Sequence, residues 1–316
     1  MTKVLVTGAT GFIGSNLSRK CMEKGFDTHI LTRKTSNKWR INDILSDVTE
    51  HHSDLSNYLQ LVKFLSEIKP DIIFHFASYG THISYETESA RIIEANFVNS
   101  VNLIQAANTI DYSLFVNVGS SSEYGMKTSA MSETDILEPM SLYAVTKAAS
   151  TNFSQLMAKI FGKPIITVRP FSVYGYFEEP IRLIPATIWH CLKHKDMDLS
   201  NGTNSMDFIF IEDVVAACIK LIKTPSLNGE IINLGTGEGH TIKEVVQKIL
   251  NISQSNIALN WGRLSTSKFT PEKWVANPRK MENVLKWTPQ HSLDSGLRKT
   301  IDWMRENIDI YENFKG

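Results

Sequence analysis

The chain reads Thr7-Gly8-Ala9-Thr10-Gly11-Phe12-Ile13-Gly14 close to its N-terminus. This stretch follows the apolar run 4–6 and precedes a segment, 12–22, whose apolar residues recur at helical spacing. The first glycine of such a pattern allows a tight turn, the second lets a phosphate approach the backbone, and the third lets helix and strand pack closely. The helix start adds free N–H groups and a positive dipole end. The pattern therefore predicts a strand–turn–helix unit that binds a dinucleotide pyrophosphate through Gly8, Thr10, Gly11, Phe12, Ile13 and Gly14.

Apolar strand-like runs alternate with helix-period segments over the first two-thirds of the chain. We predict strands at 4–6, 29–31, 71–76, 114–118, 165–168 and 231–234, and helices at 12–22, 58–68, 90–108 and 143–161. Near-continuous apolar strands separated by helices indicate an α/β fold, a doubly wound and mostly parallel Rossmann sheet with a smaller C-terminal α/β substrate lobe. We expect residues 1–169 to form the dinucleotide-binding domain, with parts of 207–240 returning to it, and 170–206 and 241–316 to form the lobe.

The composition excludes several classes of protein. The 316 residues include 33 Lys+Arg and 33 Asp+Glu, a neutral balance that argues against binding nucleic acid or a membrane surface. No apolar run approaches the roughly 18 residues that span a bilayer, and the three cysteines are too few for a disulfide framework. His190 and His194 have zinc-compatible spacing but no evident third ligand, so we expect no metal. A soluble, cytoplasmic enzyme is expected.

The end of the second predicted strand indicates which dinucleotide is bound. NAD-binding proteins of this fold place an acidic residue there, against the 2′-hydroxyl of the adenosine ribose. Here the sequence reads Leu31-Thr32-Arg33-Lys34, without a carboxylate. Arg33 can bind a 2′-phosphate with paired hydrogen bonds, so we predict NADP, with NAD as the alternative. Asp54 and Leu55, after the next short strand, are expected beside the adenine.

A second group of residues points to acid–base chemistry. Tyr143 and Lys147 are four apart in a predicted helix and share one face. An ammonium group beside a phenol lowers the phenol's pKa, and the sequence predicts this effect for Tyr143. The polar segment Gly119-Ser120-Ser121-Ser122-Glu123-Tyr124-Gly125 follows the strand 114–118, at the sheet edge where ligands bind. A serine hydroxyl there could polarise a substrate carbonyl.

The glycine loop, the serine segment, Tyr143-x-x-x-Lys147 and the stretch Arg169-Pro170-Phe171-Ser172-Val173-Tyr174-Gly175 resemble the extended short-chain dehydrogenase/reductase family, in its nucleotide-sugar epimerase, dehydratase and 4-keto reductase branch. The resemblance implies a catalytic triad of Ser120, Tyr143 and Lys147, with Ser121 as the alternative serine. Further cofactor contacts are implied for Tyr143, Lys147, Phe76, Ala77, Ser78, Asn96 and Pro170. It also implies a homodimer formed through the helices 90–108 and 143–161.

The substrate side departs from the family pattern. Ser172 stands where the family usually has asparagine, and Met206 where it usually has an arginine that holds a diphosphate. Arg182 or Arg263 could supply the missing cation. We expect the sugar to contact Thr81, His82, Ser121, Ser122, Ser172, Arg182 and Arg263.

Three reactions are compatible with this pattern. Dehydratases of the family carry an acidic residue directly after the triad serine or threonine, and Ser121 and Ser122 occupy these places if Ser120 belongs to the triad. If Ser121 belongs to the triad instead, Ser122 and Glu123 follow it, and Glu123 provides the acidic residue. Arg33, at the end of the second predicted strand, and the Ser-Ser-Glu-Tyr-Gly segment favour NADPH-dependent reduction of a 4-keto-6-deoxy nucleotide sugar. A nucleotide-sugar 4-epimerase or 4,6-dehydratase with tightly bound NAD is the alternative, and a non-catalytic dinucleotide-binding regulator is the alternative of another class.

Overall fold

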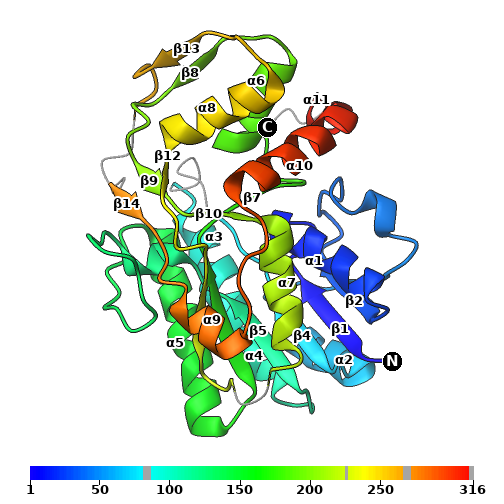
Figure 1. Ribbon diagram of the computed structural model, residues 1–316. Coiled ribbons are helices and arrows are strands. Elements are labelled where there is room, and N and C mark those ends of the chain that lie inside the picture. The colour runs from blue at the N-terminus through cyan, green and yellow to red at the C-terminus, as the bar shows by residue number, and fades with distance from the viewer. Residues whose placement is uncertain (81–86, 225–226, 266–271, 313–316) are drawn as a thin grey trace.

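The structure, a computed structural model, describes residues 1–80, 87–224, 227–265 and 272–312. A seven-stranded sheet lies at its centre, with strand order β11-β6-β5-β4-β1-β2-β3 (Figure 1). Each of its neighbouring pairs is parallel. The strands are β1 (Lys3–Thr7), β2 (Asp27–Thr32), β3 (Thr49–His52), β4 (Ile72–His75), β5 (Leu114–Val118), β6 (Ile165–Pro170) and β11 (Ile231–Leu234). The strand order reverses direction at β1 and β4, which confirms the predicted doubly wound sheet.

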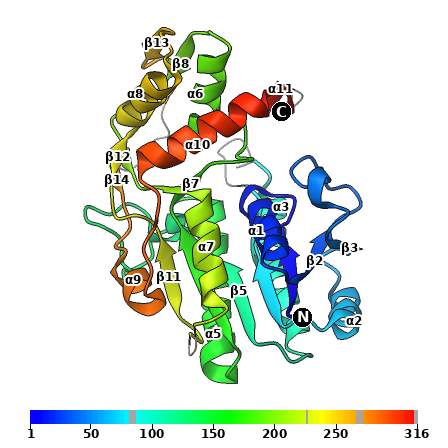
Figure 2. The ribbon, with the colours of Figure 1, turned by 45° about the vertical axis from the view of Figure 1, so that its right-hand side comes forward.

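Helices cover both faces of this sheet (Figure 2). One face carries α1 (Phe12–Glu23), α7 (Ile211–Leu221) and α9 (Arg279–Leu285). The other carries α2 (Tyr58–Ile68), α5 (Leu142–Phe161) and a continuous helical segment made of α3 (Ser89–Ile93), η3 (Glu94–Val98) and α4 (Asn99–Ala107). Two short 3₁₀ turns, η1 (Asn42–Ile44) and η4 (Ser121–Tyr124), lie in the connections after β2 and β5.

The strands are apolar because both of their faces are buried. Along β1, Val4 and Val6 enter a core shared with α1 and α7, whereas Leu5 enters the core shared with α2, α4 and α5. Successive side chains of a strand point to opposite faces, so a strand buried on both sides is mostly apolar, and the polar residues that it does carry, such as His75 of β4 and Asn117 of β5, are buried as well.

One predicted helix has a different form. The sequence predicts an unbroken helix over 90–108, and the structure interrupts it with the wider π turn η3. Asn96 lies in this turn, fully buried, and its side-chain amide bonds both the N–H and the carbonyl of Tyr79, each at 2.8 Å. Such π turns accommodate an extra residue and are frequent near functional sites.

The rest of the chain forms a smaller group of elements above the sheet. Its helices α6 (Leu183–Leu192), α8 (Ile242–Ser253) and α10 (Leu293–Glu306) pack on one another, and α11 (Ile308–Glu312) follows. Its strands pair as β8 (Met197–Leu199) with β13 (Leu259–Trp261), and as β12 (His240–Thr241) with β9 (Ser205–Met206) and β14 (Lys273–Trp274). The pair β7 (Ser172–Tyr174) and β10 (Phe208–Phe210) lies between these elements and the sheet. The division into domains at 169/170 stays a prediction.

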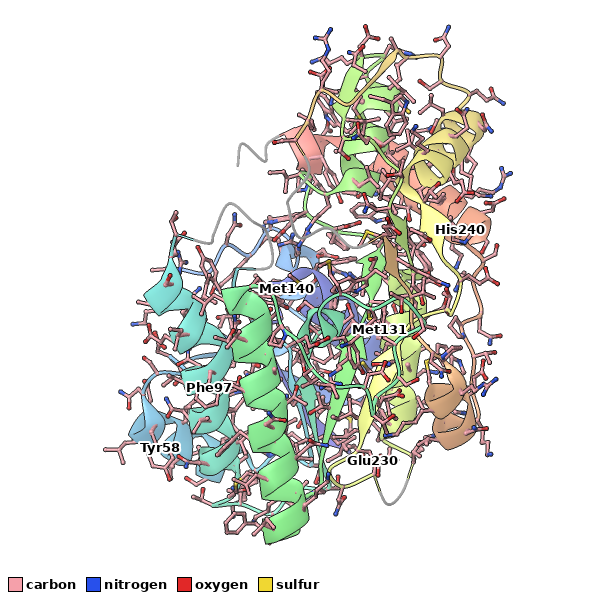
Figure 3. The ribbon with its side chains drawn as sticks, turned by 90° about the vertical axis from the view of Figure 1, so that its left-hand side faces the viewer. Tyr58, Phe97, Met131, Met140, Glu230 and His240 are labelled. Atoms are coloured by element: carbon pink, nitrogen blue, oxygen red, sulfur yellow. The ribbon has the colours of Figure 1, made fainter. Side chains whose placement is uncertain are left out.

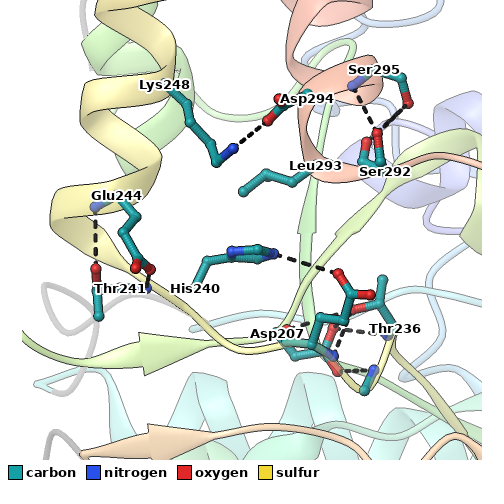
Figure 4. A network of polar contacts seen from close by, with 12 residues as sticks. Asp207, Thr236, His240, Thr241, Glu244, Lys248, Ser292, Leu293, Asp294 and Ser295 are labelled. Atoms are coloured by element: carbon teal, nitrogen blue, oxygen red, sulfur yellow. Dashed lines mark hydrogen bonds and ion pairs between the residues drawn. The ribbon is translucent and has the colours of Figure 1, made fainter.

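Local polar contacts fix this upper part of the molecule (Figure 4). Thr241 and Glu244 cap the start of α8 reciprocally, each side chain accepting from the other residue's backbone N–H. Lys248 of α8 pairs with Asp294 of α10 at 2.6 Å. No helix of the described residues is long and apolar enough to cross a bilayer.

Candidate active site

The glycine loop has the geometry that its sequence requires. Gly8 adopts φ +73°, and a Cβ there would lie 2.4 Å from the backbone nitrogen of Ala77 at the end of β4. A Cβ on Gly14 would lie 2.2 Å from the carbonyl oxygen of Gly8. Any side chain at either position would separate the loop from the strand or the helix, so both residues are glycine for steric reasons.

The loop borders a cavity of about 950 Å³ at the carboxyl ends of the strands. Gly8, Thr10, Gly11, Phe12, Ile13 and Gly14 all line it, as do Phe76, Ala77, Ser78 and Pro170 at the ends of β4 and β6. The smaller group of elements closes the other side with Met206, Phe208, Ile242 and Trp274. A phosphate-binding loop, a helix N-terminus and a cavity of this size together fit a dinucleotide and a second ligand.

The end of the cavity beside β2 carries one basic and one acidic side chain, Arg33 and Asp54. Arg33 and Ser36 line it, and they bracket a turn in which the Arg33 N–H donates to the Ser36 hydroxyl at 3.0 Å. Asp54 and Leu55 line the same end, and the Asp54 carboxylate accepts from the Ser56 N–H, a bond that lowers its pKa. The strand end itself carries no carboxylate.

Ser120, rather than Ser121, faces the phenol of Tyr143. The Ser120 hydroxyl opposes the rise in the pKa of Tyr143, and its Oγ lies 2.7 Å from Ser122 Oγ. The Oγ of Ser121 instead accepts from the indole N–H of Trp274 at 2.9 Å. The structure thus brings Ser120 and Tyr143 together in the cavity wall.

The pKa expected for Tyr143 is wrong in direction. Burial raises it to about 12, and the groups that oppose this rise are the Ser120 hydroxyl and Arg182 rather than Lys147. Lys147 is only 2% exposed, lies behind the cavity wall, and has its own pKa lowered by burial to about 8. The prediction counted the charge of the lysine and omitted the larger cost of ionising a buried phenol.

Not every predicted contact residue reaches the cavity. Ser121, Ser122, Ser172 and Arg182 line it, whereas Arg263 is exposed just after β13 and does not line it. Arg263 is therefore not brought to the site, because β13 pairs with β8 and neither strand lines the cavity. Thr81 and His82 lie outside the described residues. Asn96 does not line the cavity and instead braces the backbone of Tyr79, which does.

Sequence reasoning missed three residues of this site. Trp274 reaches the serine segment from β14, 153 positions along the chain, and no local pattern marks it. Asp207 is fully buried and accepts from the backbone N–H groups of Thr236, Gly237 and Ala276, so it holds the turn after β11 in place (Figure 4). Glu178 also borders the cavity, with its carboxyl buried.

The family model described as "NAD dependent epimerase/dehydratase family" matches residues 4–235. The chain belongs to this family. The prediction of an enzyme from the extended short-chain dehydrogenase/reductase family, in its nucleotide-sugar branch, is confirmed.

Relatives with epimerase and dehydratase names cover the whole chain. A Bacillus subtilis protein named as an uncharacterized UDP-glucose epimerase (YtcB) is 29% identical over 96% of this chain and 98% of its own. The dTDP-glucose 4,6-dehydratase of Shigella flexneri is 25% identical over 99% of this chain and 95% of its own. Among solved structures, UDP-glucuronic acid 4-epimerase from Bacillus cereus, in complex with UDP-glucuronic acid and NAD, is 27% identical with a TM-score of 0.87, over 97% of this chain and all of its own.

Two further expectations concern a second copy of the chain and a metal ion. Apolar side chains are exposed along α3, η3, α4 and α5, which lie side by side on one face (Figure 3), among them Ile93, Val98, Val145, Leu156 and Ile160. The homodimer through these helices stays a prediction. Within the described ranges, no group of three or more His, Cys, Asp or Glu side chains could hold a metal ion.

Proposed function

We propose that this enzyme transfers hydride between a nicotinamide dinucleotide and C4 of a nucleotide-activated sugar, and that its net reaction is the reduction of a 4-keto-6-deoxy sugar by NADPH. The observation that favours NADPH over NADH is the position of Arg33 at the end of the cavity beside β2. Arg33 and Ser36 lie where the adenosine ribose is expected, and the β2 end offers no carboxylate to a 2′-hydroxyl. A 2′-phosphate would find a guanidinium and a hydroxyl there. NADPH is the usual reductant that an enzyme exchanges at every turnover.

In this proposal Tyr143 donates the proton. A phenol whose pKa is raised to about 12 is neutral at physiological pH, which is the state that a proton donor needs. Ser120 lines the cavity with Tyr143 and can donate to the same substrate oxygen. Lys147, one helical turn along α5, lies buried behind the cavity wall. The nicotinamide supplies or accepts the hydride when it is bound.

The dehydratase alternative lacks an acid that follows Ser120 and lines the cavity. The two residues after Ser120 are serines, and the Glu123 carboxylate is fully buried, with both oxygens engaged by protein groups. Removal of water from a sugar requires a group that can exchange protons with it, and Glu123 does not line the cavity.

The epimerase alternative is the second candidate, and the relatives favour it over the reductase. Two of the three described above carry epimerase names, and the Bacillus cereus enzyme holds NAD. A 4-epimerase of this chain would use the same Ser120 and Tyr143 and would return the hydride to the sugar within one turnover.

Cofactor stoichiometry separates the two candidates. The enzyme is incubated with NADPH and a panel of UDP-, GDP-, CDP- and dTDP-linked 4-keto-6-deoxy sugars, and NADPH oxidation is compared with sugar consumed. In a second arm it is incubated with NAD⁺ and the corresponding nucleotide hexoses, which carry a hydroxyl at C4. The reductase requires one NADPH for each sugar. Inversion at C4 of a nucleotide hexose without net change in the dinucleotide would replace the reductase by the epimerase.

Arg33→Asp is expected to reverse the choice of dinucleotide. Replacing the guanidinium by a carboxylate removes a partner of the 2′-phosphate and repels it, while offering an acceptor to a 2′-hydroxyl. The ratio of the Kd values for NADP⁺ and NAD⁺ is expected to change about a hundredfold, measured by calorimetry. Lys34→Asp makes the same charge change on a residue that does not line the cavity. An equal effect of both variants would contradict a direct contact of Arg33.

A further inference from the structure

Glu123 is the residue of the serine segment that the reaction itself leaves without a role. It is 0% exposed and lies in η4, directly behind Ser120. Burying a carboxylate is costly unless it is paired and hydrogen-bonded. The burial of Glu123 must therefore be explained by its partners.

Both carboxylate oxygens of Glu123 are bonded to groups that surround the proposed catalytic residues. Oε1 accepts from the backbone N–H of Ser120 at 2.7 Å and from Thr151 Oγ1 at 3.0 Å. Oε2 accepts from Arg169, whose Nε lies at 2.9 Å and whose second guanidinium nitrogen lies at 2.7 Å. Thr151 stands one helical turn beyond Lys147 on α5. The carboxylate therefore joins the Ser120 loop, the helix that carries Tyr143 and Lys147, and the end of β6.

We propose that Glu123 is a positioning residue, which holds the Ser120 backbone against α5 so that the Ser120 hydroxyl meets the phenol of Tyr143. The inference rests on the function proposed above. Arg169, itself 1% exposed, pairs with the Glu123 carboxylate and stacks its guanidinium 4.6 Å from the centre of the Tyr124 ring.

The charge of Glu123 also reaches the acid–base pair. It raises the pKa of Tyr143 and opposes the lowering of the pKa of Lys147. The other groups that act on these two residues are Ser120 and Arg182 on Tyr143, and His75 of β4, whose own pKa Lys147 depresses. Removal of the negative charge at Glu123 thus moves the proton affinity of Tyr143 downward, a change that loss of packing alone would not produce.

Glu123→Gln tests this role, because it keeps an acceptor for the Ser120 N–H and removes the charge. We expect kcat on the sugar that turns over best in the panel above to fall about tenfold to a hundredfold, since small displacements of a reacting group have effects of this size. The KM for the sugar and the Kd for NADP⁺ are expected to stay within about threefold of wild type. Glu133→Gln is the matched control: Glu133 also accepts a backbone N–H, that of Asn233 at 2.8 Å, and has no contact with Ser120.

A second readout does not depend on knowing the substrate. The phenolate of Tyr143 is titrated in the NADP⁺ complex by ultraviolet difference absorbance, each protein being compared with its Tyr143→Phe counterpart. In Glu123→Gln the titration is expected to move to lower pH by about one unit. An unchanged kcat, or an unmoved titration, would overturn the proposal for Glu123. If wild type turns over no nucleotide sugar, the proposed function fails, and the titration still decides the role of Glu123.

The unpaired Arg169 of the single variant could prevent folding. In that event the double variant Glu123→Gln/Arg169→Met, which leaves no buried charge without a partner, replaces it. Its kcat and its Tyr143 titration are then compared with wild type in the same way. Thr151→Val adds a graded test, because it removes one of the four bonds to the carboxylate and keeps the charge. It is expected to lower kcat less than Glu123→Gln and to leave the Tyr143 titration where it is in wild type.

Discussion

Tyr143→Phe is expected to lower kcat about a thousandfold, equivalent to about 4 kcal/mol of transition-state stabilisation, while the Kd for NADP⁺ stays within about twofold of wild type. The variant keeps the aromatic ring that lines the cavity and removes the hydroxyl that bonds Ser120. When hydride adds to the C4 carbonyl of the sugar, the carbonyl oxygen must receive a proton. Within the described part of the cavity wall, the phenol beside Ser120 is the acid that we assign to this step.

The measurement pairs turnover on the nucleotide-sugar panel with calorimetry of NADP⁺ binding. Tyr58→Phe, on the partly exposed start of α2, is the control for removing a tyrosine hydroxyl elsewhere in the molecule. A Tyr143→Phe enzyme with more than a tenth of wild-type kcat would contradict the role of the phenol as proton donor. Loss of NADP⁺ binding together with turnover would assign the residue to binding instead.

The parts of the fold that sequence predicts are those that local physics decides. The turn at Gly8 and the close approach at Gly14 involve backbone atoms near in sequence, apart from Ala77 at the end of the neighbouring strand, and the glycines mark them directly. The apolar strands are readable because burial on both faces favours runs of apolar residues. The position of Arg33 in the cavity was predictable because it follows a strand whose place in the sheet the pattern sets.

The parts that sequence did not predict depend on partners distant in the chain. Glu123 looks like an available acid in the segment Ser122-Glu123-Tyr124, and only the pairing with Arg169, 46 residues away, shows that it is engaged. The pKa of Tyr143 depends on how deeply folding buries the ring, which spacing to Lys147 does not reveal. Arg263 was proposed for its charge alone, and in the structure it is exposed after β13 and does not line the cavity.

Glu178→Gln is expected to stabilise the protein toward unfolding, in a manner that depends on pH. The Glu178 carboxyl accepts a backbone hydrogen bond from Gly175, and its Oε2 has no hydrogen-bond partner within the described structure. Burial raises the pKa of this carboxyl to about 8, against the opposing charges of Arg182 and Arg40 and with a smaller contribution from Glu179. An amide of the same shape would occupy this position without ionising.

The sign follows from where the proton is held. Below the pKa of an unfolded glutamate, about 4.5, folded and unfolded chains both hold the proton, and Glu178 has no effect on stability through its ionisation. Between about 4.5 and about 8 the folded chain keeps a proton that the unfolded chain releases, so stability falls as pH rises. At pH 7 this cost is on the order of 3 kcal/mol, and above about pH 8 it levels off.

Urea unfolding of the dinucleotide-free protein measures the effect at an acidic and an alkaline pH. Glu178→Gln is expected to equal wild type near pH 4.5 and to exceed it by a few kcal/mol near pH 8. The adjacent Glu179→Gln is the matched control, because its carboxylate is 38% exposed and lies 3.8 Å from Arg40, an arrangement worth little in either direction. A gain that is the same at both pH values would mean that packing, and not the proton on Glu178, separates the variant from wild type. A loss at alkaline pH would mean that Glu178 is ionised in the folded chain and held by Arg182, in which case its charge stabilises the junction between α6 and the glycine loop.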